Sequence, residues 1–501
     1  MILILIGLAV AAFLIYRYYE SDRHYWTRRG IPGPPSAFFW GNFREIIKSD
    51  HPRALVFNEW AQQYGKVYGI SEGRRKALVI SDYKMVEEIL TKKFDCFQGR
   101  SKFPLQSPKQ GPKTNIIEAH GAHWKRLRAL GSPAFSNNSL KKILSTVEQS
   151  AHIMLEHLGN SDGNVNMMAF YQEYTIDIIS KLALGKKDVK MFENPFRHLA
   201  NDVFTATLGH PVNFVPSLFP FMRMPWLFLV ENIGNLLGVP YTVLLNDLRT
   251  LVALRKKERA AGQPSSDDFI DMFLDAEVDQ NDISYEGDRK DAISRQLGFE
   301  EVAQLCLIFV LAGYETTANS LSYVTHFLAT HPIVQERMRE EIGAICPDED
   351  ISFEQLNELK YTESVIKESL RHYPLGSFVV ARECTRSTQV GDLFIEKGTA
   401  LYTNTWAIHM NEELWGTDVR EFRPERWLDG SLTAPRAAFQ GFGEGPRMCL
   451  GMRLAFMEEK VALAHLLRRF SIRMTEKTNP IKLMGCFTVY PQHVTVRVQR
   501  R

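Results

Sequence analysis

The chain has 501 residues, of which 45% are hydrophobic and 24% are charged, with a formal net charge of +2. This composition is typical of an ordinary globular protein and excludes wholesale disorder, a collagen-like repeat and a disulfide scaffold. The small positive charge gives no reason to expect nucleic acid as a partner. No internal repeat or long Gly/Ser linker interrupts the body of the chain, so we expect one large domain.

The first predicted element is an apolar helix at the N-terminus. Ile2–Tyr16 has no charged residue and is followed by Arg17, Arg23, Arg28 and Arg29. A helix of this length is short for a membrane, but flanking tyrosines and a snorkelling arginine can extend it. A cleaved signal peptide is the alternative, although no basic segment precedes the apolar run. We expect a retained single-pass anchor in the endoplasmic reticulum membrane, with the main body in the cytosol.

A short Pro/Gly segment separates this anchor from the rest of the chain. The sequence GIPGPP at residues 30–35 predicts a stiff, non-helical hinge, because proline removes backbone donors and restricts the preceding residue. We therefore divide the chain into an anchor with its basic flank (residues 1–29), the hinge (30–35) and a main domain (36–501). The six cysteines lie far apart, without zinc-type spacing, which fits reduced thiols facing the cytosol.

The middle of the chain contains an unusually apolar and aromatic segment, Val212–Pro240. Its prolines argue against a membrane-spanning helix. Two interpretations stay open: packing within the core, or a lid over a substrate channel that touches the bilayer surface beside the anchor.

Most of the remaining elements are predicted to be helical. The periodicity of Phe299–Pro332 predicts a long, buried central helix, and Asn357–Pro374 predicts a second helix that also stops at a proline. The acidic stretch Ser265–Asp291 predicts a solvated helix and loop without chemistry. Phe378–Asn404 is rich in β-forming residues broken by turns, and Val494–Gln499 alternates like a strand. The predicted fold class is mainly α with small β-sheets.

The segment FGEGPRMCLG, Phe442–Gly451, holds one cysteine in a loop of glycines. Glycines let a backbone turn tightly and approach a flat object closely. A strong helical pattern follows Cys449, and the amides and positive dipole at a helix N-terminus favour a thiolate. A thiolate in this setting is a strong ligand for haem iron. Arg447 could then reach a haem propionate, and Phe442 could lie beneath the macrocycle.

A buried structural cysteine beside a glycine turn is the alternative interpretation. The ten residues, however, match FxxGxRxCxG, the haem-binding loop of the cytochrome P-450 monooxygenases, at every fixed position. The chain resembles this superfamily over nearly its whole length, and most of all the microsomal group that includes the drug- and steroid-oxidising family three and its nematode relatives. The resemblance implies a single haem domain of the cytochrome P-450 fold, in which Cys449 is the axial ligand of haem b.

The resemblance also assigns roles to the central helix. AGYETT, Ala312–Thr317, matches the oxygen-activating pattern of the family. Gly313 would let the helix open locally beside the haem, Thr316 would hydrogen-bond to activated dioxygen, and Glu315 would feed protons from solvent. Alternatively, the Thr316 hydroxyl bonds back to the carbonyl of Ala312, as mid-helix threonines often do.

A buried ionic clasp is expected on the cysteine side of the haem. Glu368 and Arg371 match the ExxR motif and share one helix face, and Arg426 in FRPERW corresponds to the third member of the network. The resemblance implies that this clasp holds the cysteine loop. The residue after the last arginine is usually Phe in the family and is Trp427 here, a change that we expect to affect packing only.

Further arginines are candidates for the two haem propionates. Trp124 and Arg128 in WKRLR match the WxxxR helix of the family, and Arg382 aligns with another propionate-binding arginine. Guanidinium groups suit carboxylates because they form paired hydrogen bonds. We set Arg100 aside, because the loop around it differs in length from the family pattern.

The function that the resemblance implies is a monooxygenase. It would insert one oxygen atom of dioxygen into an apolar substrate of xenobiotic, steroid or fatty-acid type. No dinucleotide fingerprint occurs, so electrons would come from NADPH-cytochrome P-450 reductase, with a cytochrome b-type donor as a further candidate. Lys125, Arg126 and Arg436 are candidate docking charges. A haem-thiolate isomerase or dehydratase, and a haem sensor or lipid-binding protein without turnover, are the rival hypotheses; the Glu315–Thr316 pair argues against both.

Overall fold

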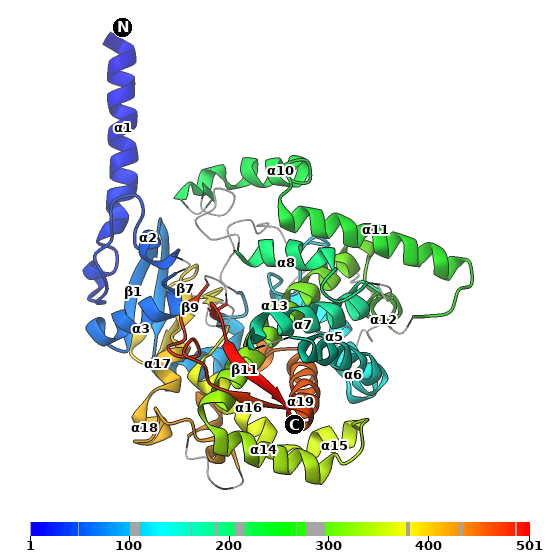
Figure 1. The fold of residues 1–501 in the computed structure, drawn as a ribbon. Helices are drawn as coiled ribbons and strands as arrows, with labels where there is room; N and C mark the ends of the chain where they lie inside the picture. The colour runs from blue at the N-terminus through cyan, green and yellow to red at the C-terminus, as the bar shows by residue number, and fades with distance from the viewer. Residues whose placement is uncertain are drawn as a thin grey trace.

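The computed structural model describes residues 2–48, 50–100, 111–161, 163–185, 189–205, 215–216, 218–266, 268–276, 296–376, 381–428, 430, 434–485 and 488–501. Helices dominate these residues, as Figure 1 shows. In chain order they are α1 (Ile2–Arg23), α2 (Phe43–Ile46), α3 (Arg53–Tyr64), α4 (Tyr83–Glu87), α5 (Gly121–Gly131), α6 (Asn137–Gly159), α7 (Met167–Ala183), α8 (Pro195–Thr205), α10 (Arg223–Ile233), α11 (Pro240–Ala260), α12 (Phe269–Asp275), α13 (Phe299–Thr330), α14 (Pro332–Ile345), α15 (Phe353–Glu358), α16 (Lys360–His372), α17 (Thr405–His409), α18 (Glu412–Trp415) and α19 (Met452–Arg469).

The strands are short and form small sheets among the helices. They are β1 (Val67–Glu72), β2 (Arg75–Ile80), β3 (Asn164–Asn166), β4 (Arg382–Glu383), β5 (Thr388–Val390), β6 (Leu393–Ile395), β7 (Ala400–Thr403), β8 (Phe470–Arg473), β9 (Leu483–Met484), β10 (Tyr490–Pro491) and β11 (Thr495–Arg500). The largest sheet has the order β1-β2-β7-β4, in which β2 and β7 are parallel and the other pairs antiparallel. The structure thus confirms a mainly α fold with small sheets.

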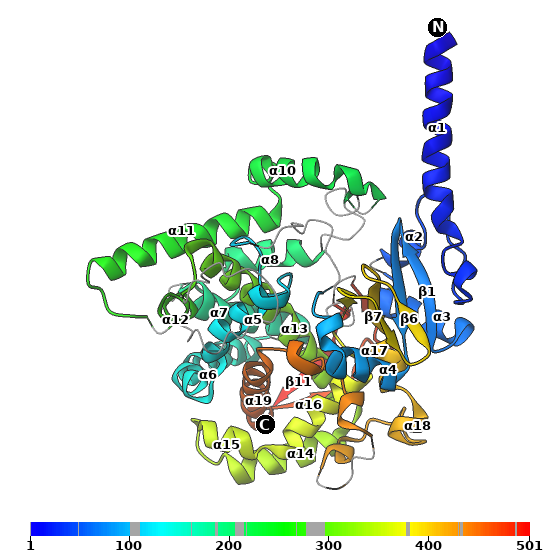
Figure 2. The same cartoon turned by 180° about the vertical axis from the view of Figure 1, so that it is seen from behind.

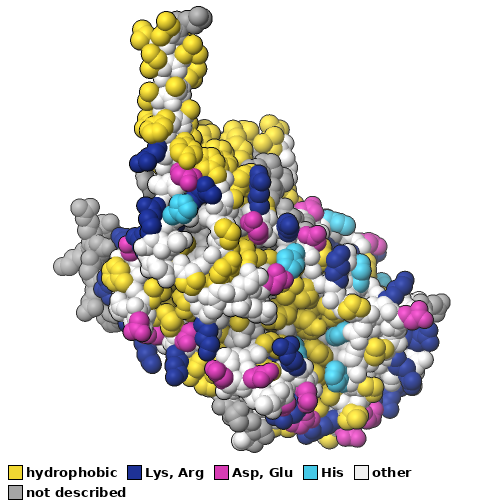
Figure 3. Space-filling view, turned by 90° about the vertical axis from the view of Figure 1, so that its left-hand side faces the viewer, with side chains coloured by type: hydrophobic (Ala, Val, Ile, Leu, Met, Phe, Trp, Pro, Cys, Tyr) yellow, Lys and Arg dark blue, Asp and Glu magenta, His cyan; other side chains and the backbone are white. Residues whose placement is uncertain are grey.

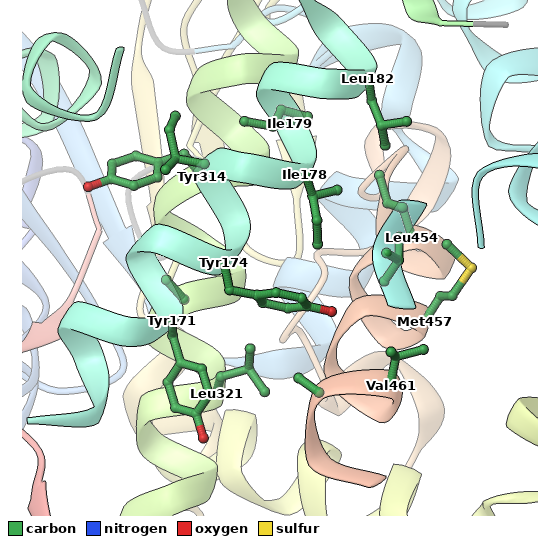
Figure 4. Close-up of a cluster of buried hydrophobic side chains, with 14 of the residues drawn as sticks. Tyr171, Tyr174, Ile178, Ile179, Leu182, Tyr314, Leu321, Leu454, Met457 and Val461 are labelled. Carbon is green, nitrogen blue, oxygen red and sulfur yellow. The ribbon is translucent and has the colours of Figure 1, made fainter. Parts of the chain in front are cut away.

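The core is built around α13, whose side chains are buried along almost its whole length. The helix starts where the Gly298 amide donates a hydrogen bond to the Glu301 carboxylate at 2.8 Å, and it ends just before Pro332. Helices α7 and α19 pack against it, and Figure 4 shows aromatic and aliphatic side chains of the three helices meeting in one buried cluster. Burial of this kind stabilises an apolar helix by about 25 cal/mol per Å² removed from water.

The helix and strand predictions in the second half of the chain are confirmed. The central helix lies within Phe299–Pro332, and α16 ends before Pro374 as expected. The β-rich region after residue 380 contains the β5–β6 hairpin and strands β4 and β7, and the terminal strand is β11. Of the acidic stretch, the structure describes α12 and the residues around it; residues 277–291 lie outside the described part, as do 378–380.

Helix α1 stands apart from the globular body in Figures 1 and 2 and extends beyond the predicted apolar run. Among the described residues it alone is long and apolar enough to cross a membrane. Its last turns contact the main domain: the buried Tyr19 donates a hydrogen bond to the Leu218 carbonyl at 2.9 Å, and its ring lies 4.9 Å from that of Phe39. Asp22 forms an ion pair with Lys76 at 3.0 Å. These contacts hold the C-terminal end of α1, which precedes the predicted hinge, against the main domain.

A group of exposed hydrophobic side chains lies at the same end of the molecule as α1. Helix α10 lies crosswise to α1, at the height of its lower part, in Figures 1 and 2, and Figure 3 shows hydrophobic side chains covering α1 and gathering next to its base. The exposed members in and around α10 are Phe221, Met222, Met224, Phe228, Leu229, Leu236 and Leu237. Of the two interpretations of Val212–Pro240, this exposure favours the lid over core packing for the described residues; residues 212–214 and 217 lie outside that part.

Candidate functional site

A cavity of about 920 Å³ lies at the centre of the main domain. Helix α13 forms one wall and the cysteine loop forms the floor. Residues 113–118, the start of α11 and part of α10 also line the cavity, and the first of these segments contacts the floor where Arg447 donates to the Ile116 carbonyl at 3.1 Å. Most of the side chains that line the middle are apolar, as in sites for small organic ligands.

The cysteine loop is held in shape by its own backbone. The Cys449 amide donates a hydrogen bond to the Phe442 carbonyl, and the Met448 amide to the Gly445 carbonyl, both at 2.9 Å. Gly445 has φ of +73°, and a Cβ there would lie 2.0 Å from the Leu90 carbonyl oxygen, so only glycine fits. Helix α19 begins three residues after the cysteine, as the sequence predicted.

The Cys449 side chain faces the cavity. It is exposed by accessible area, and the surface that it exposes belongs to the cavity wall. Burial by the surrounding protein raises the pKa of the thiol, while the Gly451 amide, Arg128 and Arg100 act in the opposite direction. Without a metal ion, burial raises the pKa of the thiol more than the Gly451 amide and the two arginines lower it. Coordination to a metal ion reverses that balance, because a coordinated thiol is deprotonated.

Four arginines converge on the same floor: Arg100, Arg128, Arg382 and Arg447 all line the cavity. Burial lowers the pKa of each guanidinium, and the other members of the group lower most of them further. The pKa of Arg447 is lowered first by burial and then by Arg100, Arg382 and Arg128. Bringing so many like charges together is costly unless an anion joins them.

The arginine group fits a ligand with two negative charges. In the described part of the chain, no carboxylate forms an ion pair with Arg100, Arg128 or Arg447. The Nε atoms of Arg100 and Arg447 are buried and find no hydrogen-bond partner among the described residues, although Arg447 donates to the backbone carbonyls of Ile116 and Gln98 through its other nitrogens. Spare donors and surplus positive charge beside a cysteine suit the propionates of haem.

Arg100 is the member that sequence reasoning set aside. Its amino group donates to the Arg447 carbonyl at 3.3 Å, which places it next to the cysteine loop despite the different loop length. Arg128 was found through the WxxxR motif and Arg382 through its alignment with an arginine of the family, because the residues around both are recognisable. Arg100 has no such flanking pattern, and only the fold shows its position.

Two aromatic residues complete the floor. Trp124 is buried and lies under the Arg447 guanidinium at 4.4 Å, while Phe442 packs against Phe456 at 5.1 Å. Both line the cavity beside Cys449. The structure therefore brings together Cys449 and all the residues that the sequence predicted for cofactor binding.

The central helix borders the cavity through Ala312, Gly313 and Thr316. A Cβ at Gly313 would lie 3.1 Å from the Ile179 side chain of α7, so the helices approach closely here. The Thr316 hydroxyl donates to the Ala312 carbonyl at 2.6 Å, which is the alternative that the sequence left open. In this conformation the hydroxyl still lies at the cavity wall, and its oxygen remains able to accept a hydrogen bond.

Glu315 does not itself line the cavity, although its hydrogen-bond partner Thr488 does. Its buried carboxylate accepts a hydrogen bond from the Thr488 hydroxyl at 2.7 Å, and burial raises its pKa to about 7. A carboxyl group with this pKa exchanges a proton near neutral pH. Glu315 is only 4% exposed, so a proton from solvent must reach its carboxylate through other groups. The proton-feeding role stays a prediction.

The clasp on the cysteine side is present and fully buried. Glu368 accepts hydrogen bonds from Arg371 at 2.8 and 3.0 Å and from the Nε of Arg426 at 2.9 Å. Burial alone would raise the pKa of Glu368, but hydrogen bonds from His372 and Arg371 and the charges of Arg371 and Arg426 hold it well below the usual range. The carboxylate is therefore ionised at any physiological pH.

A histidine connects the clasp to the cysteine loop. The Arg371 guanidinium donates to the His409 carbonyl at 2.9 Å, and the His409 ring bridges the Arg371 carbonyl, at 3.1 Å, and the Gln440 amide, at 2.9 Å. Burial, and then Arg371, lowers the pKa of His409 to about 3, so the ring is neutral. These partners assign the proton to Nδ1. Gln440 lies two residues before Phe442, so the position of the clasp fixes the start of the loop.

Two sequence-based expectations need correction. Trp427 does more than pack, because its indole Nε1–H donates to Glu368 Oε2 at 2.8 Å and supplies a donor that phenylalanine lacks. Arg126 is not a surface docking charge: it is buried and forms an ion pair with Glu301 at 2.7 Å. Lys125 and Arg436 are exposed, as expected.

A cavity floored by a cysteine and four arginines, beneath a long central helix, defines a haem-thiolate protein. The family model for cytochrome P450 matches residues 31–496 of the chain. The chain is 40% identical to the putative cytochrome P450 CYP13A10 of Caenorhabditis elegans over 97% of its own length and 96% of the relative. It is 39% identical to the putative cytochrome P450 CYP13A3 of the same organism over 99% and 98% of the two chains. The chain belongs to the cytochrome P450 family, whose members are monooxygenases that bind haem b through a cysteine thiolate.

Replacing Trp427 by phenylalanine should weaken the clasp. Loss of one hydrogen bond to a buried carboxylate should lower the free energy of unfolding by about 1.5–3 kcal/mol. Chemical denaturation followed by the Soret band would measure the change. Trp60→Phe is the matched control, since its indole packs against Phe57 and Tyr68. Equal losses in the two variants would show that the Trp427 hydrogen bond contributes nothing beyond packing.

Replacing Arg100 by glutamine should have opposite effects with and without haem. The haem-free protein should become more stable, because the remaining guanidiniums repel each other less. Haem should dissociate about tenfold faster, because one charge-assisted hydrogen bond is lost. Haem transfer to apomyoglobin measures the dissociation rate, with Arg436→Gln as a surface control. An unchanged rate would remove Arg100 from the binding site.

Proposed function

We propose that the protein is a membrane-anchored monooxygenase in which Cys449 is the axial thiolate ligand of haem b. The observation that carries the proposal is the position of this thiol on the cavity floor, beside Arg100, Arg128, Arg382 and Arg447. When bound, haem supplies the chemistry that activates dioxygen, by which one oxygen atom is inserted into the substrate and the other is reduced to water.

The protein contributes position, charge balance and protons. The arginines would neutralise the propionates, and Trp124 and Phe442 would contact the flat macrocycle. Backbone hydrogen bonds hold the cysteine loop, and the clasp with His409 fixes where the loop begins. We assign Thr316 to hydrogen bonding on the dioxygen side and Glu315 to proton storage close to it, supported by the pKa of about 7.

The cavity is the basis for the proposed substrate class, and the lack of a dinucleotide fingerprint in the sequence is the basis for a separate electron donor. The cavity is large and mostly apolar, which supports an apolar organic substrate of xenobiotic, steroid or fatty-acid type. We propose NADPH-cytochrome P-450 reductase as the electron donor, with docking at the exposed Lys125 and Arg436 on the side of the cysteine loop. A cytochrome b-type donor is a further candidate.

The N-terminal helix supports a location at the endoplasmic reticulum membrane. Helix α1 would cross the bilayer once, and the arginines after it would hold the main domain on the cytosolic side. The exposed hydrophobic residues around α10 would then rest on the membrane surface. Apolar substrates could reach the cavity from the bilayer through this lid.

The assignment of the axial ligand is tested by Cys449→Ser. The reduced carbon monoxide complex of the wild type should show the strongly red-shifted Soret band of a thiolate ligand, and the variant should lose it. Cys346→Ser is a suitable control, because this cysteine is buried elsewhere. Survival of the band in Cys449→Ser would mean that another residue binds the iron.

The role of Thr316 is tested by its alanine variant. Haem and substrate binding should persist, while reducing equivalents from NADPH should be diverted to hydrogen peroxide. Thr330→Ala, on the same helix but outside the cavity, is the control. Unchanged coupling would exclude Thr316 from the reaction. Turnover of a hydroperoxide without NADPH, with no oxygen consumption when reductase is added, would instead favour the isomerase hypothesis.

A further inference from the structure

The proposed role of Glu315 requires a supply of protons, although its carboxylate is buried and does not line the cavity. On the cavity side, its contact is the Thr488 hydroxyl, which donates to the carboxylate at 2.7 Å. The cavity is a poor source of protons during turnover, because an apolar substrate displaces water from it. We therefore searched the other surroundings of Glu315 for polar groups that lead to solvent.

Asn319 and Tyr323 continue the face of α13 on which Glu315 lies. They follow it by four and eight residues, and each is 0% exposed. Side chains four residues apart lie one above the other on a helix, and a long side chain leans toward the N-terminal end of its helix, so Tyr323 leans toward Asn319. Burial raises the pKa of Glu315 while the Asn319 amide acts against that rise, and burial, followed by Tyr373 and Glu315, raises the pKa of Tyr323. We call Glu315, Asn319 and Tyr323 the polar column.

The polar column has hydrogen-bonding capacity to spare. Nδ2 and Oδ1 of Asn319 and the hydroxyl of Tyr323 are buried and find no hydrogen-bond partner of normal geometry in the described part of the chain. By contrast, the Thr325 hydroxyl of the same helix is paired with the Tyr171 hydroxyl of α7 at 2.6 Å. Buried amide and hydroxyl groups are costly unless they form hydrogen bonds, and ordered water is the usual partner where the protein supplies none. The column is therefore suited to hold water next to the Glu315 carboxyl.

The far end of the polar column meets a second pocket, which opens at the protein surface. The ring of Tyr323 stacks on that of Tyr373, with centroids 4.4 Å apart and an angle of 11° between the rings. Tyr373 lines a pocket of about 570 Å³, whose wall includes the exposed Gln62, Lys66 and Arg420. Solvent in this pocket is thus separated from the column by a single side chain.

We propose that protons for the reaction enter at this surface pocket and travel along α13, past Tyr323 and Asn319, to Glu315. The inference rests on the proposed monooxygenase function and supplies the proton path that this function needs. The protonated carboxyl of Glu315 gives its proton to the Thr488 oxygen as the Thr488 hydroxyl proton leaves toward the cavity. The carboxylate then takes up a new proton from the column. Asn319 and Tyr323 are positioning residues, which orient the water that carries the proton.

The experiment follows the protonation of Glu315 in the haem-loaded, full-length protein in nanodiscs. A laser pulse releases protons from a caged compound, starting about one pH unit above the pKa of about 7, and time-resolved infrared spectroscopy records the carbonyl band of the neutral carboxyl. Subtracting the signal of Glu315→Gln isolates the band of this residue. For each further variant, the starting pH is set relative to the pKa that its own titration gives.

Tyr323→Phe and Asn319→Leu should each slow the uptake of a proton by Glu315 about tenfold, because each removes a hydrogen-bonding group and nearly keeps the side-chain shape. Asn319→Ser, which keeps a hydrogen-bonding group, should recover part of the rate. Tyr171→Phe is the matched control, since it removes a buried hydroxyl that contacts another face of α13, and it should not change the rate. Wild-type rates in both Tyr323→Phe and Asn319→Leu would overturn the proposal.

Thr488→Val tests the opposite direction of entry. It should leave proton uptake by Glu315 unchanged and, during turnover with reductase, divert reducing equivalents to hydrogen peroxide. If Thr488→Val slows the uptake while Tyr323→Phe and Asn319→Leu do not, the protons come from the cavity and the proposed path is wrong.

The same samples separate this proposal from the proposed function. The carbon monoxide spectrum of each sample reports whether the haem-thiolate site is intact. If the red-shifted band is absent from the wild type, the proposed function fails. If the band is present and the variants of the polar column take up protons as fast as the wild type, only the proton path fails.

Discussion

The site depends on the repulsion among four arginines at the floor of one cavity, of which Arg382 and Arg447 are buried and Arg100 and Arg128 are half-buried. Arg100, Arg128, Arg382 and Arg447 come from four separate segments, and each loses solvation where the others add like charge. A protein that keeps such a group in its interior is built for an anionic partner, because the partner's binding energy offsets the cost of assembling the charges. The cysteine between them decides the kind of partner: a flat, dianionic group that carries iron.

The second constraint is the clasp beneath the cavity floor, where the charges attract one another instead of repelling. Glu368 gathers Arg371, Arg426 and Trp427 around one ionised carboxylate, and the neutral ring of His409 passes this position on to the backbone before Phe442. The clasp is electrostatically satisfied in the protein alone, whereas the arginine group is not. The clasp therefore stabilises the folded protein on one side of the cysteine loop. The arginine group on the other side supplies binding energy for an anionic ligand.

Much of this arrangement could be predicted from the sequence, because short motifs carry it. The cysteine loop, AGYETT, ExxR and WKRLR each combine a recognisable spacing with residue types that one chemistry requires. Arg100 and His409 could not be found in this way, since neither lies in such a pattern and their roles arise from contacts between distant segments. Trp427 was misjudged because its ring looked like a replacement for phenylalanine, and only the fold shows its N–H aimed at Glu368. Likewise, nothing in the sequence around Arg126 indicates that its side chain is buried in an ion pair with Glu301, 175 residues away.

We expect a sulfur atom to coordinate the haem iron at the cavity floor. Iron K-edge X-ray absorption of the purified, haem-loaded protein tests it most directly, because the scattering identifies the elements bound to the metal. We predict four porphyrin nitrogens and one sulfur in the first shell. A first shell of nitrogen and oxygen alone would contradict the account.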